Sequence, residues 1–583
     1  MNSIYGLIAN EPAQDQTMAQ AGAQENSLSV GNGVLCSGQK NGYAMAGGDH
    51  LAWYGGIYAI AGKNASRANI DAGQLLALYQ QEGLEFLFRL HGAFVIAIWN
   101  GRHLLLARDR FGHKPLYYTQ TPDSFIFAHS VDQLGRERAL PRKANWNALY
   151  HYLSVQSIPA PLTAYEGVYK LAAGHCLSFQ PGGRPDIRPW FQTEFLPDEK
   201  LEINIAKDLL KLKLDQALEG INVNACLLSG GVDSSLVAAL AARKRSLKTY
   251  SMGFSHASHD ETMFARQAAQ ILGTRHQVLP MGNPEMAVLK LAQLYQEPFA
   301  DSSAMAFVEL ARELGGQAML CGDGGDDLFA GYPRYLNLFQ YAPGQQIPEN
   351  IQARFQDEVS CLQTIMGARA PMPPVGETVY YTYWARFWGQ LKLRLCSAQL
   401  QASADPLSSF LLFWQHPGRN KARHSLDAVQ LFELDYYTGS TLMPKTDVTT
   451  RPYGLEVFAP LMDVEVADLA FRLPLNCRVG VWQEAMPAQA KCLLKLAALD
   501  YFPPEFVLRP KMGFGVPIEH WLRKELKSML WDLLLSAKSR QRGLFNMTVV
   551  EHMLHEHQKR VREWHYPLWA LLMLELWFVE HMD

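Results

Sequence analysis

The pattern of apolar and polar residues changes near residue 200. Residues 1 to about 190 carry short alternating apolar runs separated by Gly-rich turns, which predicts a mainly β first domain. From residue 200 to 583, short apolar runs alternate with amphipathic helical segments. The predicted strands are Ala225–Leu228, Lys248–Phe254, His276–Leu279 and Ala318–Cys321. Strands that alternate with helices predict a parallel, doubly wound α/β sheet in a second domain.

Composition excludes several classes of protein. The chain has 583 residues, of which 48% are hydrophobic and 19% charged, as is typical of a globular protein with two or more domains. A net charge of −3 and the lack of a long basic run argue against a nucleic-acid partner. The start of the chain has no secretory signal, and the apolar stretch Leu568–Val579 is too short to span a bilayer, so it predicts a buried C-terminal helix. The eight cysteines are scattered without a CxxC pair, which favours a reducing cytoplasmic compartment and no zinc site.

A Ser/Gly-rich loop follows the first predicted strand of the second domain. It reads Leu227-Leu228-Ser229-Gly230-Gly231-Val232-Asp233-Ser234-Ser235 and leads into a predicted helix. The glycines allow close backbone approach, the helix start presents N–H groups to an anion, and Ser229, Ser234 and Ser235 add hydroxyl donors. A carboxylate beside phosphates implies Mg²⁺, for which Asp233 is the candidate ligand. The loop lacks a Walker A lysine and resembles the pyrophosphate loop of ATP pyrophosphatases, with an ordinary Ser/Gly turn as the alternative.

A second loop, Cys321-Gly322-Asp323-Gly324-Gly325-Asp326-Asp327-Leu328-Phe329-Ala330-Gly331-Tyr332, is rich in glycine and acidic residues. Its three carboxylates would repel one another without a cation. A Mg²⁺ ion shared between Asp233 and Asp326 would neutralise them and bridge the phosphates of ATP. A solvated acidic turn is the alternative.

Further motifs extend the pattern over most of the chain. They are Ala107-Arg-Asp-Arg-Phe-Gly-His-Lys-Pro-Leu-Tyr-Tyr118, Glu297-Pro298-Phe-Ala-Asp301-Ser302-Ser303, Gly454-Leu-Glu-Val457 with Pro460-Leu-Met-Asp463, and Arg509-Pro-Lys-Met-Gly-Phe-Gly-Val-Pro517. With both loops, they make the chain resemble the asparagine synthetase family. The resemblance implies an N-terminal Ntn-hydrolase-like (glutaminase type 2) αββα domain over residues 1–190. It also implies a C-terminal ATP-pyrophosphatase-like synthetase domain with a parallel α/β sheet over residues 200–583.

The resemblance also assigns roles to single residues. Leu227, Met252, Cys321 and Gly322 are expected to line the adenine and ribose pocket, and Asp233 and Asp326 to bind Mg²⁺. Asp323 stands where the family often has Glu, a residue implicated in handling the amine. Lys491 matches the lysine that stabilises charge on the adenylate, although its spacing alone would favour a surface lysine. Arg509 and Lys511 are further candidates for phosphate contact.

The first domain departs from the family pattern at its catalytic positions. Glutamine-dependent members have a nucleophilic cysteine at position 2, where this chain has Asn2. The family's Asn-Gly-Glu oxyanion segment reads Tyr54-Gly55-Gly56, and Asp71 is the one candidate remnant of the glutamine clamp. We therefore expect no glutamine hydrolysis, as in β-lactam synthetase and lasso peptide cyclases, relatives whose glutaminase-like domain is inactive.

A second departure lies near the expected acceptor site, where Val448 and Phe458 replace two family arginines. Their loss argues against a small doubly charged acid such as aspartate, unless these residues only pack between domains. The expected function is an ATP-dependent amide ligase that adenylates the carboxylate of a peptide or small metabolite bearing its own amine. Ammonia-dependent asparagine synthesis and a non-catalytic nucleotide-binding scaffold are the alternatives. A partner protease or biosynthetic enzyme and a homodimer stay open.

Overall fold

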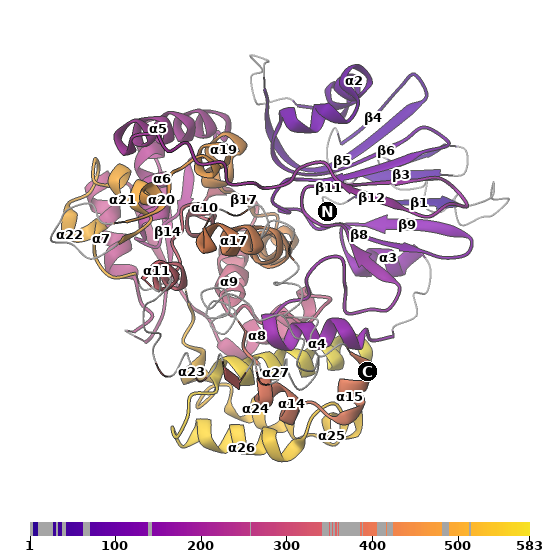
Figure 1. Cartoon of the computed structure of the whole chain (residues 1–583), viewed down its shortest axis with the longest axis vertical. Coiled ribbons are helices and arrows are strands. Elements are labelled where there is room, and N and C mark those ends of the chain that lie inside the picture. The colour runs from indigo at the N-terminus through magenta and orange to yellow at the C-terminus, as the bar shows by residue number, and fades with distance from the viewer. Residues whose placement is uncertain are drawn as a thin grey trace.

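The computed structural model describes most of the chain. The described residues are 4–9, 27–30, 33–37, 42–61, 70–137, 143–256, 258–340, 349, 353, 356–357, 360, 385–387, 389–404, 416, 422, 424–480, 489–511 and 515–583. Asn2, most of the 340–430 region and part of the Arg509–Pro517 motif lie outside them. Figure 1 shows a β-rich body built by the N-terminal part of the chain beside a helical body built by the rest.

The first body contains two antiparallel six-stranded sheets. One has the order β10 (Val168–Lys170), β8 (Tyr117–Gln120), β9 (Ser124–Ala128), β1 (Ile4–Ala9), β3 (Gly33–Ser37) and β2 (Ser27–Val30). The other has the order β12 (Asp186–Pro189), β11 (His175–Phe179), β7 (Leu104–Arg108), β6 (Leu90–Trp99), β5 (Asp49–Ile60) and β4 (Tyr43–Ala46). Helix α3 (Val131–Glu137) covers the first sheet, and α2 (Ala72–Glu82) covers the second. The predicted αββα domain is confirmed.

Asp71 has a local structural role in this body. Its carboxylate accepts a hydrogen bond from the backbone N–H of Gln74 at 2.9 Å, and the Gln74 side chain accepts one from the Asp71 N–H at 3.2 Å. This reciprocal pair is a capping box, which satisfies N–H groups at the start of α2. Helix capping therefore explains an aspartate at this position without a bound glutamine.

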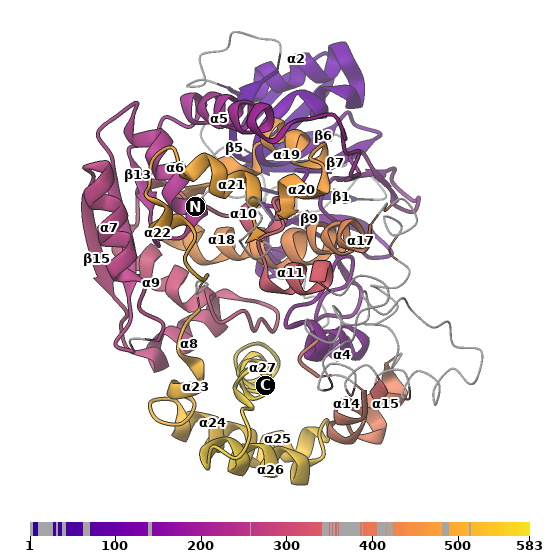
Figure 2. The same cartoon turned by 60° about the vertical axis from the view of Figure 1, so that its left-hand side comes forward.

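The second body is built around a five-stranded parallel sheet, whose strands β13 and β15 are labelled at the left of Figure 2. Its order is β15 (Arg275–Pro280), β14 (Lys248–Gly253), β13 (Ala225–Leu227), β16 (Ala318–Leu320) and β17 (Glu456–Phe458). All four predicted strands are present and parallel, and β17 is an addition to the prediction. Strand order reverses between β13 and β16, the position where ligands bind in such sheets.

Helices flank this sheet and form a separate layer below it. The helices nearest the sheet are α5 (Ile203–Gly220), α6 (Val232–Ala242), α7 (Thr262–Leu272), α8 (Pro284–Leu294), α9 (Ala304–Leu314), α10 (Gly325–Leu328), α11 (Pro333–Gln340), α17 (Ser425–Phe432), α18 (Met443–Thr450), α19 (Val464–Phe471), α20 (Leu475–Arg478), α21 (Cys492–Ala498) and α22 (Pro504–Val507). The lower layer contains α14 (Gly389–Leu395), α15 (Ala398–Ser403), α23 (Ile518–Trp521), α24 (Lys527–Leu534), α25 (Ala537–Arg542), α26 (Met547–Gln558) and α27 (His565–Trp577). Short pieces are the 3₁₀ helices Gly83–Arg89, Arg451–Tyr453 and Pro460–Met462, the π-helical segments η4 (Glu433–Leu442) and Phe578–Met582, and the hairpin of β18 (Val479–Gly480) and β19 (Gln489–Ala490).

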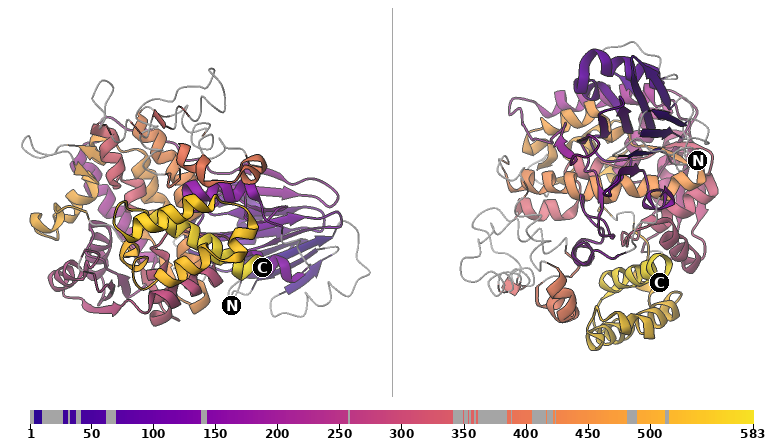
Figure 3. Two further views of the ribbon diagram at one scale, coloured as in Figure 1. Left: turned by 90° about the horizontal axis from the view of Figure 1, so that it is seen from below. Right: turned by 90° about the vertical axis from the view of Figure 1, so that its right-hand side faces the viewer.

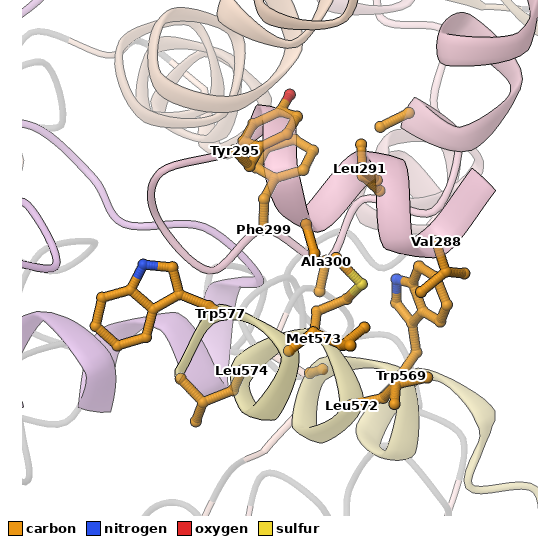
Figure 4. Packing of buried hydrophobic residues seen from close by; sticks show 14 of the residues in the cluster. Val288, Leu291, Tyr295, Phe299, Ala300, Trp569, Leu572, Met573, Leu574 and Trp577 are labelled. Atoms are coloured by element: carbon orange, nitrogen blue, oxygen red, sulfur yellow. The ribbon is translucent and has the colours of Figure 1, made fainter. Parts of the chain in front are cut away.

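The predicted C-terminal helix is confirmed as α27, which is buried over most of its length. Figure 4 shows Trp569 and Met573 of α27 on the side of that helix that faces α8, near Val288, Leu291 and, in the loop after α8, Ala300. Helix α4 (Trp146–Val155), which lies between β9 and β10 in sequence, also packs here, and its Tyr152 hydroxyl donates to the Ala570 carbonyl at 2.8 Å. In the described part of the chain, no helix has the length and apolar character needed to cross a membrane.

Candidate active site at the carboxyl ends of the parallel strands

The Ser/Gly-rich loop connects the carboxyl end of β13 to the N-terminus of α6. The Ser229 hydroxyl lies 3.1 Å from the Ser234 hydroxyl and accepts a hydrogen bond from the Gly231 N–H at 3.2 Å. Gly231 is the N-cap residue of α6, and no side chain caps that end. The first N–H groups of α6 are therefore aimed at the mouth of the loop, where the helix dipole favours an anion such as a phosphate.

Two glycines in these loops are required by close backbone contacts. Gly230 has φ +82°, and a Cβ there would lie 2.6 Å from the carbonyl carbon of Phe264. A Cβ on Gly322 would lie 2.5 Å from the backbone nitrogen of Ser234. The acidic loop, residues 321–332, therefore lies directly against the start of α6, so that both predicted loops form one site.

Asp233, Asp326 and Lys491 meet where the two loops touch. The Lys491 ammonium contacts the Asp233 carboxylate and lies 2.7 Å from Asp326 Oδ1. Lys511 adds a second ammonium at 2.6 Å from the same Asp326 oxygen. Lys491 is only 6% exposed, so the alternative of a surface lysine is wrong.

Burial and neighbouring charges shift the pKa values of these groups in opposite directions. Burial alone would lower the pKa of Lys491, but the Asp233 and Asp326 carboxylates raise it above its ordinary value. Burial alone would raise the pKa of Asp326, but Lys491 and Lys511 hold it well below its usual range. The site therefore places a charged ammonium beside the ionised Asp326 carboxylate, and such an ammonium can stabilise negative charge that develops on a phosphate or acyl group.

The backbone places Lys491 in this position. Lys491 adopts a left-handed conformation, φ +57° and ψ +39°, between the β18–β19 hairpin and α21. Such a conformation is costly for a residue with a side chain and persists where the surroundings fix it. A Cβ on Gly331 would lie 1.9 Å from Lys491 Cε and 2.2 Å from Asp326 Oδ1, so a glycine is required there to admit both side chains.

The carboxylates fit a Mg²⁺ ion that is bound together with phosphates. Asp233 Oδ1 is buried and has no hydrogen-bond partner among the described residues. The described residues contain no group of three or more His, Cys, Asp or Glu side chains placed to hold a metal by themselves. Mg²⁺ is usually held by one or two carboxylates plus substrate phosphates, so Asp233 and Asp326 would hold it.

The other two acidic residues of the loop point elsewhere. Asp323 Oδ2 accepts a hydrogen bond from the Thr446 hydroxyl at 3.4 Å, and Asp327 Oδ1 accepts one from Thr438 at 2.6 Å. Burial raises the pKa of Asp327 to about 6. Asp326 alone of the three contacts Lys491, so it is the loop carboxylate that is placed beside Asp233, the pair named in the sequence analysis.

The residues expected around adenine and ribose lie on three neighbouring strands. Leu227 ends β13, Met252 lies near the end of β14, and Cys321 and Gly322 follow β16. Met252 and Cys321 are buried. Their nucleotide contacts stay a prediction.

Arg509 holds the phosphate-loop backbone. Its guanidinium donates to the carbonyls of Gly230 and Phe506, each at 2.7 Å, and lies 4.0 Å above the Phe264 ring. Both terminal nitrogens of Arg509 are thus bound to backbone carbonyls, whereas Lys511 contacts Asp326 beside Lys491. Of the two cations predicted to reach phosphate, Lys511 is the better placed.

A buried ion pair beside the acidic loop was not predicted from the sequence. Arg334 pairs with Glu433, which is fully buried, and its guanidinium lies 3.8 Å above the ring of Tyr332. Burial raises the pKa of Glu433 to about 8 despite this pair. Arg334 follows Tyr332 closely in the sequence, but Glu433 lies about 100 residues further on, so local sequence gave no signal for the pair.

The two sequence departures meet at the domain seam, the contact between the β sandwich and the parallel-sheet body (Figure 3). The Tyr54 hydroxyl donates to Asp447 Oδ1 at 2.7 Å. A Cβ on Gly56 would lie 3.2 Å from the Phe458 ring. Val448 lines a cavity of about 50 Å³ at the same seam, together with Lys170 and Glu297, which pair at 2.9 Å. Phe458 therefore packs between the domains, which was the alternative interpretation, and a change of substrate at this position stays a prediction.

Comparison with known proteins agrees with this geometry. The family model for asparagine synthase matches residues 207–579, and the one for a glutamine amidotransferase domain matches residues 58–191. The chain is 27% identical over 527 residues to asparagine synthetase [glutamine-hydrolyzing] 1 of Bacillus subtilis (strain 168), covering 87% of this chain and 80% of that protein. It is 28% identical over 338 residues to amidase chry2 of Gibberella zeae, covering 51% of this chain and 50% of that protein. The chain therefore belongs to the asparagine synthetase family and is an ATP-dependent ligase of the amide-forming type.

Proposed function

We propose that this chain forms an amide bond in two steps, with release of PPi and then AMP. A substrate carboxylate oxygen attacks the α-phosphorus of ATP and PPi leaves. An amine nitrogen then attacks the acyl carbon, AMP leaves with the bonding electrons of the acyl–oxygen bond, and the nitrogen loses a proton. The convergence of Asp233, Asp326 and Lys491 at the start of α6 carries this proposal.

Each group has a separate task in this proposal. The N–H groups at the start of α6 bind the phosphate that leaves as PPi. Asp233 and Asp326 hold Mg²⁺, which supplies charge neutralisation to the phosphates. The Lys491 ammonium stabilises negative charge in both steps. Asp323, in the same loop, is our candidate for contact with the attacking amine.

We propose further that the amine belongs to the substrate and does not come from glutamine hydrolysed in this chain. Asn2 cannot act as the nucleophile of a glutaminase. The strand segment that would supply the oxyanion donors is engaged at the domain seam, since Tyr54 binds Asp447 and Gly56 lies against Phe458. Peptides or small metabolites that carry both a carboxylate and an amine are the substrate class that this favours.

The test is PPi release by the purified protein with Mg-ATP and hydroxylamine, which traps acyl-adenylates as hydroxamates. A panel of amine-bearing carboxylates and short peptides is compared with aspartate plus ammonium and with glutamine. We expect PPi and hydroxamate with a member of the panel and no glutamate from glutamine. Asp233→Ala abolishes both signals if the reaction occurs at this site. Full biological activity of that variant would support a non-catalytic scaffold instead.

Ammonia-dependent asparagine synthesis is the second candidate, because the Bacillus subtilis relative that matches over most of this chain is named an asparagine synthetase. Asparagine formed from aspartate, ATP and ammonium would establish it and contradict the specialised substrate. Glutamate release from glutamine would contradict both accounts of the amine source.

A further inference from the structure

Three contacts cross the domain seam from β5, and each ends beside the acidic loop. In the first, Tyr54 donates to Asp447 at 2.7 Å, and Lys114 of the first body binds the same oxygen at 2.5 Å. The neighbour of Asp447 in the sequence is Thr446, whose hydroxyl donates to Asp323 of the loop. A hydroxyl of the first body is thus two side chains away from a carboxylate of the active site.

The second contact fixes the residue before α19. The Tyr58 hydroxyl donates to Asp463 Oδ2 at 2.6 Å, and His91 Nδ1 lies 3.2 Å from the same oxygen. The adjacent residue, Met462, packs against the loop so closely that a Cβ on Gly324 would lie 2.2 Å from its sulfur. Movement of Asp463 would therefore move the side chain that supports Gly324.

The third contact reaches the first residue of the loop. Gly56 of β5 lies against the Phe458 ring, and the Phe458 carbonyl accepts a hydrogen bond from the Cys321 N–H at 2.8 Å. Asp447 and Asp463 are 5% and 3% exposed. Hydrogen bonds to such buried charged groups are stronger than those between neutral groups and are costly to remove.

We propose that Tyr54 and Tyr58 are positioning residues for the ligase reaction. Their hydroxyls fix the segments around Asp447 and Asp463, and these segments fix the acidic loop so that Asp326 faces Asp233. The inference rests on the proposed function insofar as this loop serves Mg-ATP. It gives the first body a task in amide formation that needs no glutamine.

The experiment compares Tyr54→Phe, Tyr58→Phe and the double variant with Tyr43→Phe in the full chain. Phenylalanine keeps the ring and removes only the hydroxyl. Tyr43 is the matched control, because its hydroxyl lies 2.7 Å from His50 within the first body. Hydrogen–deuterium exchange is followed in peptides that cover residues 321–331 of the nucleotide-free protein. We expect exchange there to accelerate about tenfold or more in the double variant, less in each single variant, and not at all in Tyr43→Phe.

A second readout separates positioning from general weakening. The Kd for a non-hydrolysable ATP analogue is measured without and with Mg²⁺. The ratio of the first value to the second reports how well Asp326 is placed to bind the ion. We expect the ratio to fall towards one in the double variant and to stay at the wild-type value in Tyr43→Phe, whereas a general loss of stability would change both Kd values alike.

Unchanged exchange over residues 321–331 in the single and double variants would overturn the inference, as would acceleration spread equally over the whole chain. Failure of the wild-type protein to bind Mg-ATP would instead contradict the proposed function, and the exchange data would still decide the positioning role.

Discussion

Lys491→Met removes the ammonium from between two carboxylates and nearly keeps the length of the side chain. Coulomb's law with an effective dielectric constant of about 20 gives roughly 6 kcal/mol for charges at the 2.7 Å separation of Lys491 and Asp326. The cost of burying the charges offsets part of this, and breaking a buried ion pair costs about 3–5 kcal/mol net. Because the side chains of Asp233 and Asp326 are 17% and 22% exposed, the lower end of about 3 kcal/mol applies here.

The assay is thermal unfolding of the nucleotide-free protein without and with Mg²⁺. For the second domain, residues 200–583, a loss of about 3 kcal/mol corresponds to a decrease of roughly 4 °C in Tm. Mg²⁺ should raise the Tm of Lys491→Met more than that of the wild type, since a cation then replaces the ammonium between the carboxylates. PPi release should fall about 100-fold or more at saturating substrate, because a charge-stabilising group of the transition state is lost.

Lys495→Met is the control for this experiment. Lys495 lies one turn further along α21, and its ammonium donates to the neutral Gln489 side chain at 2.7 Å. We expect no Mg²⁺-specific change in its Tm. If Lys491→Met had the same Tm and the same response to Mg²⁺ as the wild type and Lys495→Met, the ammonium would not be what neutralises the two carboxylates.

Three other changes test separate parts of the structure. Gly230→Ala should weaken nucleotide binding tenfold or more, because the new Cβ would collide with the backbone at the start of α7. Gly182→Ala controls for backbone strain alone, since Gly182 has φ +77° and a Cβ there would meet no atom within 4 Å. Equal nucleotide Kd values for the two variants would refute the reasoning. Cations next to the buried Asp447 lower its pKa from 3.8 to about 2, so about 2 kcal/mol of stability present above pH 4 should be lost as the pH falls through 2. In urea unfolding, the free energy of unfolding of Asp447→Asn should change with pH by about 2 kcal/mol less than that of the wild type. An identical change in both proteins would contradict the role of Asp447. Asn2→Cys should not create glutaminase activity, which measurement of glutamate released from glutamine would check.

Local sequence was sufficient for the strands and both loops of the site. The apolar runs at Ala225–Leu227 and Ala318–Leu320 are bounded by polar, Gly-rich residues, so their ends are visible without a structure. Strand β17 was missed because its three residues become a strand only by pairing with β16, about 140 residues earlier in the chain. Pairing at that distance leaves no local pattern.

The position of single side chains was less predictable than the loops that carry them. Successive residues of a tight loop point in different directions, so Asp323 and Asp327 bind threonines of separate elements instead of joining Asp326. Lys491 needed the family resemblance, because its left-handed backbone and its distant carboxylate partners are absent from any local spacing. For Phe458 the sequence left two interpretations open, a change of substrate and packing between domains, and the contact with Gly56 needed the structure because the two residues lie about 400 positions apart.

The tyrosines of β5 bear on whether this chain can be shortened. Deletion of the sandwich would leave Asp447 without Tyr54 and Lys114, and Asp463 without Tyr58 and His91. The second body on its own would then expose the Asp447 and Asp463 carboxylates to solvent without these partners. We therefore expect that the second body expressed without the sandwich would be less stable than the full chain, even where no glutamine is hydrolysed.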